Sequence, residues 1–160
     1  MRVYTRIMKK SLCICTNLRQ AALVATALYD EALAPSGLKV TMFRLLRNVA
    51  DCPGITITAL AAQLGLDRST LGRNLRLLER RGFAEISVRK DERARGVILT
   101  TAGQEALQAG TPLWNEAQSD LGNLIGTDVD HLLEMLRKLT DATQERTTAS
   151  GCAFEVPLDL

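Results

Sequence analysis

The apolar residues of this chain change their spacing at Gly82, and this change constrains the fold more than any other feature. Before it, two short segments, 56–64 and 68–81, carry apolar residues at helical spacing and are separated by a tight, glycine-containing turn. After it, apolar and polar residues alternate over 83–89, as in a β-strand, and a charged loop leads to a second apolar run over 97–100. The order predicts a helix-turn-helix followed directly by a β-hairpin.

Further helical patterns flank this unit on both sides, a short one over residues 41–50 and longer ones over 11–34, 101–125 and 128–147. Gly110 and Pro112 fall inside the third pattern, where they are expected to kink or interrupt the helix. The first and last helices each carry a stripe that is too apolar for a lone surface helix. We therefore expect a partner chain to cover these stripes.

Basic residues are concentrated in the segment 67–96, which holds nine Lys and Arg against five Asp and Glu, a local charge of +4. Because the whole chain carries a net charge of +2, the remainder is slightly acidic. A basic segment on an acidic body is typical of a part that contacts phosphates. The alternative interpretation is a solvated helix face with ion pairs between neighbouring turns.

These patterns predict a mainly α-helical fold with a small β-hairpin wing, an α+β class. The expected architecture is a winged helix-turn-helix over residues 38–100, flanked by N- and C-terminal dimerisation helices over 11–34 and 101–148, with a flexible tail over 149–160. The chain has 160 residues, of which 46% are hydrophobic, so it can bury one compact core without a disulfide or metal.

The second helix of the helix-turn-helix carries side chains suited to reading DNA, since in winged-helix proteins this helix lies in the major groove. Asp67 can cap the helix, and Ser69 and Thr70 place backbone N–H groups and hydroxyls in its first turn, where they can meet phosphate or base edges. Arg73 and Asn74 are bidentate donors that suit guanine and adenine. The predicted contacts are Arg68, Ser69, Thr70, Arg73, Asn74 and Arg76 in the helix, and Arg89, Arg93 and Arg95 in the hairpin.

Two stretches of the sequence resemble the MarR family of winged-helix transcriptional regulators. Residues 91–103, DERARGVILTTAG, are similar to the D-x-R wing and the L-T-x-x-G that follows it in this family. Residues 66–73, LDRSTLGR, with 78–82, LERRG, are similar to the family's recognition helix. The resemblance extends from about residue 12 to residue 147, which is most of the chain.

The resemblance implies an obligate homodimer, built from the first and last helices, that binds a pseudo-palindromic DNA operator and represses it until an effector intervenes. It also implies that Arg93 is the minor-groove residue and that Asp91 orients an arginine of the wing. By the same match Ser69, Thr70 and Arg73 fall on base-reading positions.

Two residues depart from the family pattern. Gly72 lies inside the recognition helix, where glycine costs about 1 kcal/mol relative to alanine. Arg76 stands where the family often has an acidic residue. We expect Arg76 to contact phosphate and either to raise DNA affinity or to alter sequence preference.

The cysteines near the start of the first helix leave two interpretations open. In the branch of the family that senses organic hydroperoxides, a reactive cysteine near the start of the first helix is hydrogen-bonded to tyrosines. Cys15 is similar in position to that cysteine, and Tyr29 shares its helix face. The other tyrosine positions are occupied here by Arg19 and Val40, so the hydrogen-bond network of that branch is incomplete. Arg19, one turn after Cys15, can instead favour a thiolate. Within one helix, Cys13 and Cys15 would point about 200° apart and could not easily pair. Alternatively, both are small hydrophobes buried at the dimer interface.

A small aromatic or phenolic anion, bound between the dimerisation helices and the winged helix, is the other common effector of such regulators. Candidate lining residues are Arg19, Tyr29, Phe43 and Arg47. Each of them is equally explained as a core, interface or salt-bridge residue.

Other functional classes have little support in the sequence. The chain has no G-x-S-x-G or Walker motif, and its single histidine, His131, has no second histidine or zinc-ligand spacing beside it, so we expect no enzyme, metal or cofactor. Neither a signal peptide nor a membrane span is evident, which favours a soluble, cytoplasmic protein with reduced thiols. A helical interaction module without DNA binding is a further alternative, but it leaves the basic hairpin unexplained.

Overall fold

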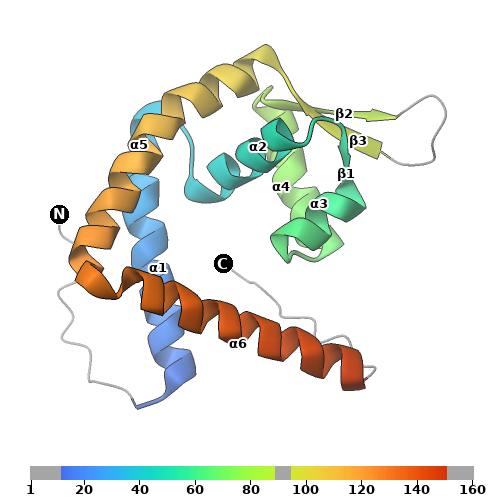
Figure 1. The fold of residues 1–160 in the computed structure, drawn as a ribbon. Helices are drawn as coiled ribbons and strands as arrows, with labels where there is room; N and C mark the ends of the chain where they lie inside the picture. Colours follow the sequence, from blue (N-terminus) through green and yellow to red (C-terminus); the bar gives the residue numbers. More distant parts are fainter. Residues whose placement is uncertain (1–11, 89–94, 151–160) are drawn as a thin grey trace.

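The computed structural model describes residues 12–88 and 95–150 (Figure 1). The helices are α1 (Ile14–Leu33), α2 (Val40–Asp51), α3 (Ile57–Leu64), α4 (Arg68–Arg80), α5 (Thr101–Ile125) and α6 (Val129–Ser150). The strands are β1 (Ile55–Thr56), β2 (Ala84–Val88) and β3 (Arg95–Leu99), and two 3-10 turns, η1 (Ala34–Ser36) and η2 (Gly126–Asp128), connect helices. The predicted fold class, mainly helical with a small β wing, is confirmed.

The sheet has three strands rather than the predicted two, in the order β1-β3-β2, and all of them pair antiparallel. The additional strand β1 pairs Ile55 with Val97 and Thr56 with Gly96. Gly96 permits this approach, because a Cβ at that position would lie 3.0 Å from the carbonyl oxygen of Gly54. A strand of two residues has no periodicity of its own, so the sequence pattern could not indicate it.

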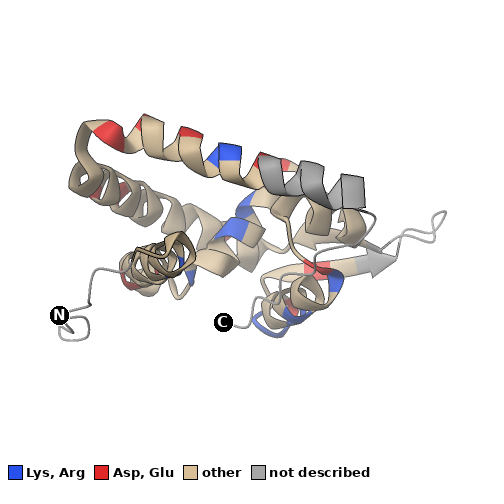
Figure 2. Cartoon of the chain, turned by 90° about the horizontal axis from the view of Figure 1, so that it is seen from below, with Lys and Arg blue, Asp and Glu red and all other residues tan. Residues whose placement is uncertain are grey.

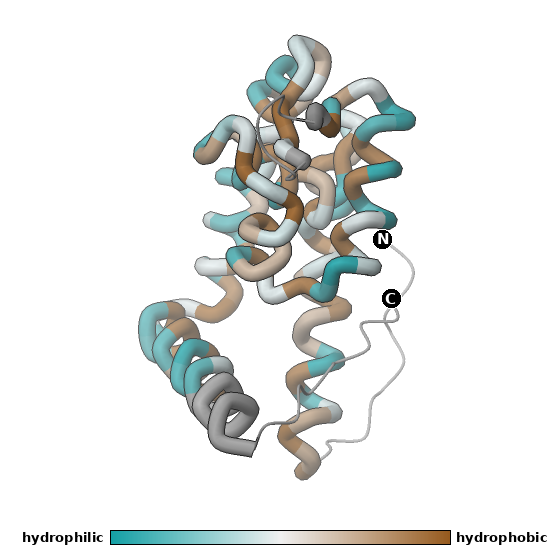
Figure 3. Tube along the Cα trace, turned by 90° about the vertical axis from the view of Figure 1, so that its right-hand side faces the viewer, coloured by the Kyte–Doolittle hydropathy of each residue, from teal (hydrophilic) through white to brown (hydrophobic). Residues whose placement is uncertain are grey.

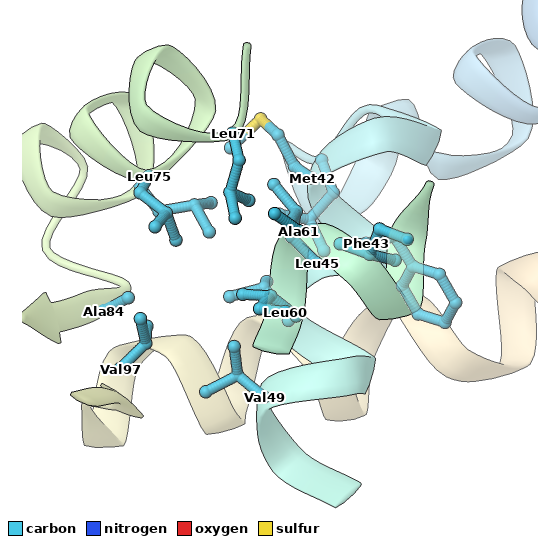
Figure 4. Close-up of a cluster of buried hydrophobic side chains, with 14 of the residues drawn as sticks. Met42, Phe43, Leu45, Val49, Leu60, Ala61, Leu71, Leu75, Ala84 and Val97 are labelled. Atoms are coloured by element: carbon cyan, nitrogen blue, oxygen red, sulfur yellow. The ribbon is translucent and has the colours of Figure 1, made fainter. Parts of the chain in front are cut away.

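One apolar core joins α2, α3 and α4 to the sheet (Figure 4). The buried side chains labelled there are Met42, Phe43, Leu45, Val49, Leu60, Ala61, Leu71, Leu75, Ala84 and Val97. Each large side chain in such a core stabilises the fold by about 1.5–3 kcal/mol through burial. The leucines of α4 are therefore held inward, and the opposite face of that helix must point outward.

The L-T-x-x-G stretch forms the junction between the sheet and α5. The hydroxyl of Thr100 accepts a hydrogen bond from the Gly103 N–H at 3.0 Å and caps the helix. The backbone N–H of Thr100 donates to the carbonyl of Phe83 at 3.1 Å. A Cβ at position 103 would lie only 1.9 Å from that same carbonyl oxygen, so only glycine fits there.

Of the two expected effects of Gly110 and Pro112, a kink or an interruption, the interruption does not occur, because α5 is continuous through Pro112. Proline removes the N–H that would bond the carbonyl of Gln108, but Gln108, Thr111 and Pro112 are all exposed. Water can therefore bond that carbonyl, and the helix continues. Gly110, two residues before Pro112, is buried and lets α5 approach the side chain of Phe43 closely, because a Cβ there would lie 3.1 Å from its ring.

A hydrogen bond of Asp30 connects helix α1 to the winged helix-turn-helix. The carboxylate of Asp30 accepts a hydrogen bond from the backbone N–H of Val40, the first residue of α2, at 2.7 Å. Lys39, the N-cap residue of α2, provides no side-chain cap, so α1 supplies it from across the loop. The long helix and the first helix of the winged unit are thus directly coupled.

Helix α6, α1 and the residue Leu12 before α1 leave apolar side chains exposed within the single chain. Figure 3 shows hydrophobic positions along both helices. The exposed apolar residues are Leu12, Ile14, Leu23, Val24, Leu28, Leu133, Met135, Leu136 and Leu139. None of the helices in the described ranges is both long and apolar enough to cross a membrane. Residues 149 and 150, which were expected to begin the tail, belong to α6, and 151–160 lie outside the described residues.

Candidate nucleic-acid interface

Helix α4 begins at Arg68 because Asp67 caps it, as the sequence predicted. One carboxylate oxygen of Asp67 accepts hydrogen bonds from the backbone N–H groups of Ser69 and Thr70, each at 2.8 Å, and from the Ser69 hydroxyl. These bonds, first that of the Ser69 side chain, hold the pKa of Asp67 well below its ordinary value. The cap is therefore ionised throughout the neutral pH range.

Four exposed residues of α4 form a single outward row, which we call the basic stripe: Ser69, Arg73, Arg76 and Arg80. Their spacing places them within about 60° of one another around the helix axis. The opposite face is buried and consists of Leu71, Leu75 and Leu78. The core thus fixes the direction in which the guanidinium groups of the stripe point.

The other predicted contacts of α4 lie beside the basic stripe. Thr70 and Asn74 are half-buried on its flank. The guanidinium of Arg68 donates to the hydroxyl of Thr58 in α3 at 2.5 Å, so it ties the two helices together. Arg80 was not among the predicted contacts, although its position eleven residues after Ser69 repeats the spacing of the stripe.

Of the hairpin residues predicted to contact DNA, only Arg95 lies within the described residues. Arg89, Asp91 and Arg93 lie outside the described residues. Arg95 is the first residue of β3, and its backbone pairs with that of Val88. The proposed roles of these residues in DNA binding remain predictions.

Acidic side chains gather elsewhere in the molecule, along η2 and α6 (Figure 2). They are Asp128, Asp130, Glu134 and Asp141. Glu134 forms an ion pair with Lys138 at 2.6 Å, both side chains being largely exposed. The charge distribution therefore favours α4, and not α6, as the part that meets phosphates.

A second cluster, which we call the aromatic junction, lies where α1, α2 and α5 meet and consists of Tyr29, Phe43, Arg47 and Trp114. The ring of Trp114 stacks on Phe43 with centroids 5.8 Å apart and on Tyr29 at 6.4 Å. The guanidinium of Arg47 lies over the same indole, 4.8 Å from its centroid. The Tyr29 hydroxyl donates to the side-chain oxygen of Gln118, and burial raises the pKa of Tyr29.

Three of the four residues predicted to line an effector pocket meet at this junction. Arg19 does not, because it precedes Tyr29 by ten residues on α1, about 15 Å along the helix axis. Trp114, on which the junction is centred, was missed by sequence reasoning. It is the only tryptophan of the chain, but its contacts with α1 and α2 depend on packing between distant segments.

Cys13 and Cys15 do not lie within one helix, contrary to expectation. Cys13 is the N-cap residue of α1, with extended backbone angles of φ −74° and ψ 116°, and the helix begins only at Ile14. A hydrogen bond with the Thr16 side chain, at the positive end of the helix, lowers the pKa of Cys13. Both thiols are exposed in the single chain.

His131 lies exposed on α6. No group of three or more His, Cys, Asp or Glu side chains within the described ranges is arranged to hold a metal ion.

A capped helix with an outward basic stripe, fixed against a three-stranded sheet by one core, defines the class of winged helix-turn-helix DNA-binding proteins. The sequence pattern of the MarR family matches residues 36–94. The transcriptional regulator HosA from Escherichia coli O111:H- is 30% identical over 132 residues, which cover 79% of this chain and 93% of HosA. The chain belongs to the MarR family, and it is a transcriptional regulator and not an enzyme.

Solved structures agree with this assignment. The transcriptional regulator MosR of M. tuberculosis, in complex with DNA, is 33% identical with a TM-score of 0.76, and the match covers 83% of this chain and 97% of MosR. The transcriptional repressor CouR, bound to p-coumaroyl-CoA, is 26% identical with a TM-score of 0.74, covering 80% of this chain and 91% of CouR. The predicted family and functional class are thereby confirmed.

Proposed function

We propose that this regulator binds a pseudo-palindromic operator as a homodimer, with α4 of each protomer in the major groove. The observation that carries the proposal is the position of the basic stripe directly opposite the buried leucines of α4. A helix presented in this way can enter a groove with its arginines toward the DNA. The likeness to MosR, which was solved in complex with DNA, supports binding to DNA.

The residues of α4 divide by role. Arg73, near the first turn, reads guanine with a bidentate pair of donors, and Asn74 reads adenine from the flank. Arg76 and Arg80, farther along the stripe, contact phosphates. Arg93 and Arg95 of the wing reach the adjacent minor groove.

A second copy of the chain covers the apolar faces of α1 and α6. Exposed leucines such as Leu133, Leu136 and Leu139 follow one face of α6, and no segment of the described chain covers them. Obligate interfaces between subunits have this apolar character. The homodimer places two copies of α4 on one side of a DNA duplex, which matches a pseudo-palindromic operator.

The regulator acts in the cytoplasm as a repressor that a small planar aromatic anion releases at the aromatic junction. Arg47 supplies a positive charge there, and within the described chain no carboxylate lies at ion-pair distance from it. Trp114 and Phe43 supply aromatic faces. CouR, a structural relative bound to p-coumaroyl-CoA, supports an effector of aromatic character.

The DNA-binding roles are tested by fluorescence anisotropy on DNA from upstream of the gene and on random DNA, each at several salt concentrations. Arg73→Ala is expected to relax discrimination at one base pair by about 1–3 kcal/mol. Arg76→Ala is expected to weaken binding to all sequences and to reduce the salt slope by about 1.

Lys39→Ala provides the matched control, since Lys39 is exposed and its side chain makes no hydrogen bond or ion pair within the described residues. Equal losses on specific and random DNA for Arg73→Ala would contradict a base-reading role. Binding of the wild-type protein to neither DNA would contradict the proposed function itself.

Thiol-based regulation is a second candidate, favoured by the lowered pKa of Cys13 at the start of α1. A hydroperoxide would oxidise the thiolate to a sulfenic acid and leave as the alcohol, and a second thiol would then form a disulfide with loss of water. Anisotropy before and after mild hydroperoxide treatment, with Cys13→Ser compared with Cys15→Ser, tests it. Binding that oxidant leaves unchanged contradicts this candidate.

A further inference from the structure

The side chain of Arg44 in α2 contacts the end of α3, just before the turn of the helix-turn-helix. One of its guanidinium nitrogens, Nη2, donates a hydrogen bond to the carbonyl oxygen of Leu64 at 3.1 Å. Leu64 is the last residue of α3, and the turn into α4 follows directly. Arg44 belongs neither to the basic stripe nor to the aromatic junction.

The bond has a clear physical basis at this position. The last carbonyls of a helix have no partner within the helix, and a cation near them is stabilised by the helix dipole. The backbone N–H groups of Gly65 and Leu66 bond to the carbonyls of Ala62 and Ala61, which leaves the carbonyl of Leu64 for Arg44. The side chain of α2 thus completes the end of α3.

A second polar link runs parallel to the first. The side-chain amide of Gln63 in α3 donates to the side-chain oxygen of Asn48 in α2 at 3.0 Å. The side-chain amide of Asn48 in turn donates to the backbone carbonyl of Arg44 at 2.7 Å. Arg44 and Asn48 are one helical turn apart, so the same face of α2 holds the end of α3 at two points.

The turn leaves little room for independent movement of α4. Between the carbonyl that Arg44 binds and the first residue of α4 lie only Gly65, Leu66 and Asp67, and Asp67 is the cap of α4. A displacement of the Leu64 carbonyl is therefore passed to the start of the recognition helix. Bidentate base recognition tolerates displacements of only about 0.5 Å.

We propose that Arg44 is a positioning residue for base recognition, which holds the α3–α4 turn so that Arg73 of the basic stripe meets the base edges, without itself contacting DNA. The proposal rests on the DNA-binding function given above. It predicts a loss of sequence discrimination that does not depend on salt.

The test compares Arg44→Met, which keeps the apolar stem but removes every donor, with Arg44→Lys, which keeps one charged donor. Anisotropy is measured for the full-length protein on operator and random DNA over a series of salt concentrations. Arg44→Met is expected to lower operator affinity about tenfold, which is the size of one charge-assisted hydrogen bond. Its affinity for random DNA and its salt slope are expected to equal those of the wild type.

Two control variants and two further measurements make the outcome specific. Arg44→Lys is expected to recover most of the ratio of operator to random affinity, and Lys39→Ala, which removes a charge from the start of α2, to leave that ratio unchanged. Hydrogen exchange is expected to be faster in Arg44→Met at the backbone amides of Gly65 and Leu66. Thermal denaturation verifies that each variant is folded at the temperature of the binding assay.

Two results would overturn the proposal. Equal losses on both DNAs with a salt slope reduced by about 1 would make Arg44 a phosphate contact. Folded Arg44→Met with wild-type operator affinity would leave the bond without a role in recognition. A wild-type protein that does not prefer its operator would instead contradict the proposed function.

Discussion

A single carboxylate, that of Asp67, determines where the recognition helix begins. It accepts bonds from two backbone N–H groups and one hydroxyl, all within the first turn of α4. Ser69 takes part in the cap and also belongs to the basic stripe, which we propose faces DNA. Changes at the cap are therefore expected to affect both stability and DNA binding.

Asp67→Ala should destabilise the protein, and the size of the loss should depend on pH. The pKa of Asp67 is lowered in the folded protein, so its stabilising effect is complete above the ordinary aspartate pKa and is lost as pH falls through the lowered value. Thermal denaturation from about pH 7 down to about pH 2 measures the difference between wild type and variant. A difference that stays constant over this range would contradict an ionised cap. Asp67→Asn should retain part of the cap at every pH.

Two glycines should respond to alanine in opposite directions. Gly103→Ala places a Cβ 1.9 Å from the Phe83 carbonyl oxygen and should cost about 3 kcal/mol or more. Gly72→Ala meets no atom within 4 Å and should raise stability by up to about 1 kcal/mol. Urea denaturation of both variants checks the pair, and a Gly103→Ala protein as stable as wild type would contradict the described junction.

At the scale of the elements, features with a strong local signal are predictable from sequence. Asp67 caps α4 as expected, and Thr56 caps α3 in the same way, because a capping side chain bonds backbone groups only two or three residues away. The basic stripe follows from helical spacing alone. Even so, Arg80 is easily missed, because a cluster of arginines shows its common face only when the whole helix is considered.

Features that depend on contacts between distant segments are not predictable in this way. Strand β1 exists because Gly96 lets another segment approach it, and the capping of α2 depends on a carboxylate of α1. The role of Arg44 as a partner for Leu64 likewise requires the packing of α2 against α3. Only the folded chain brings these groups together.

Binding of an effector at the aromatic junction should change the tryptophan fluorescence of the protein, since Trp114 is the only tryptophan. Benzoate, used as a planar aromatic anion, is expected to change the tryptophan emission and to lower operator affinity in parallel. Arg47→Met should abolish both effects, because it removes the cation that lies over the indole. Arg19→Met, a charge loss elsewhere on the surface, should leave both unchanged. An equal response from Arg47→Met would exclude Arg47 from the effector site.

At the scale of the whole molecule, the proposed homodimer is expected to depend on the apolar face of α6. Leu136→Glu should place a charge within that face and convert the dimer to monomer in sedimentation velocity experiments. Operator affinity should fall with it, because each protomer binds only one half-site. Asp141→Asn, a substitution on the charged side of the same helix, should leave the dimer intact. A dimeric Leu136→Glu protein would place the interface elsewhere.

One set of residues holds the recognition helix in place, and a different set forms its outward surface. Arg44, Arg68 and the buried leucines secure α4, while Arg73 and Arg76 point away from these contacts. An engineer could therefore exchange the outward residues for those of another regulator without disturbing the support beneath them. The chain offers a scaffold on which operator preference can be rewritten while the fold is left as it is.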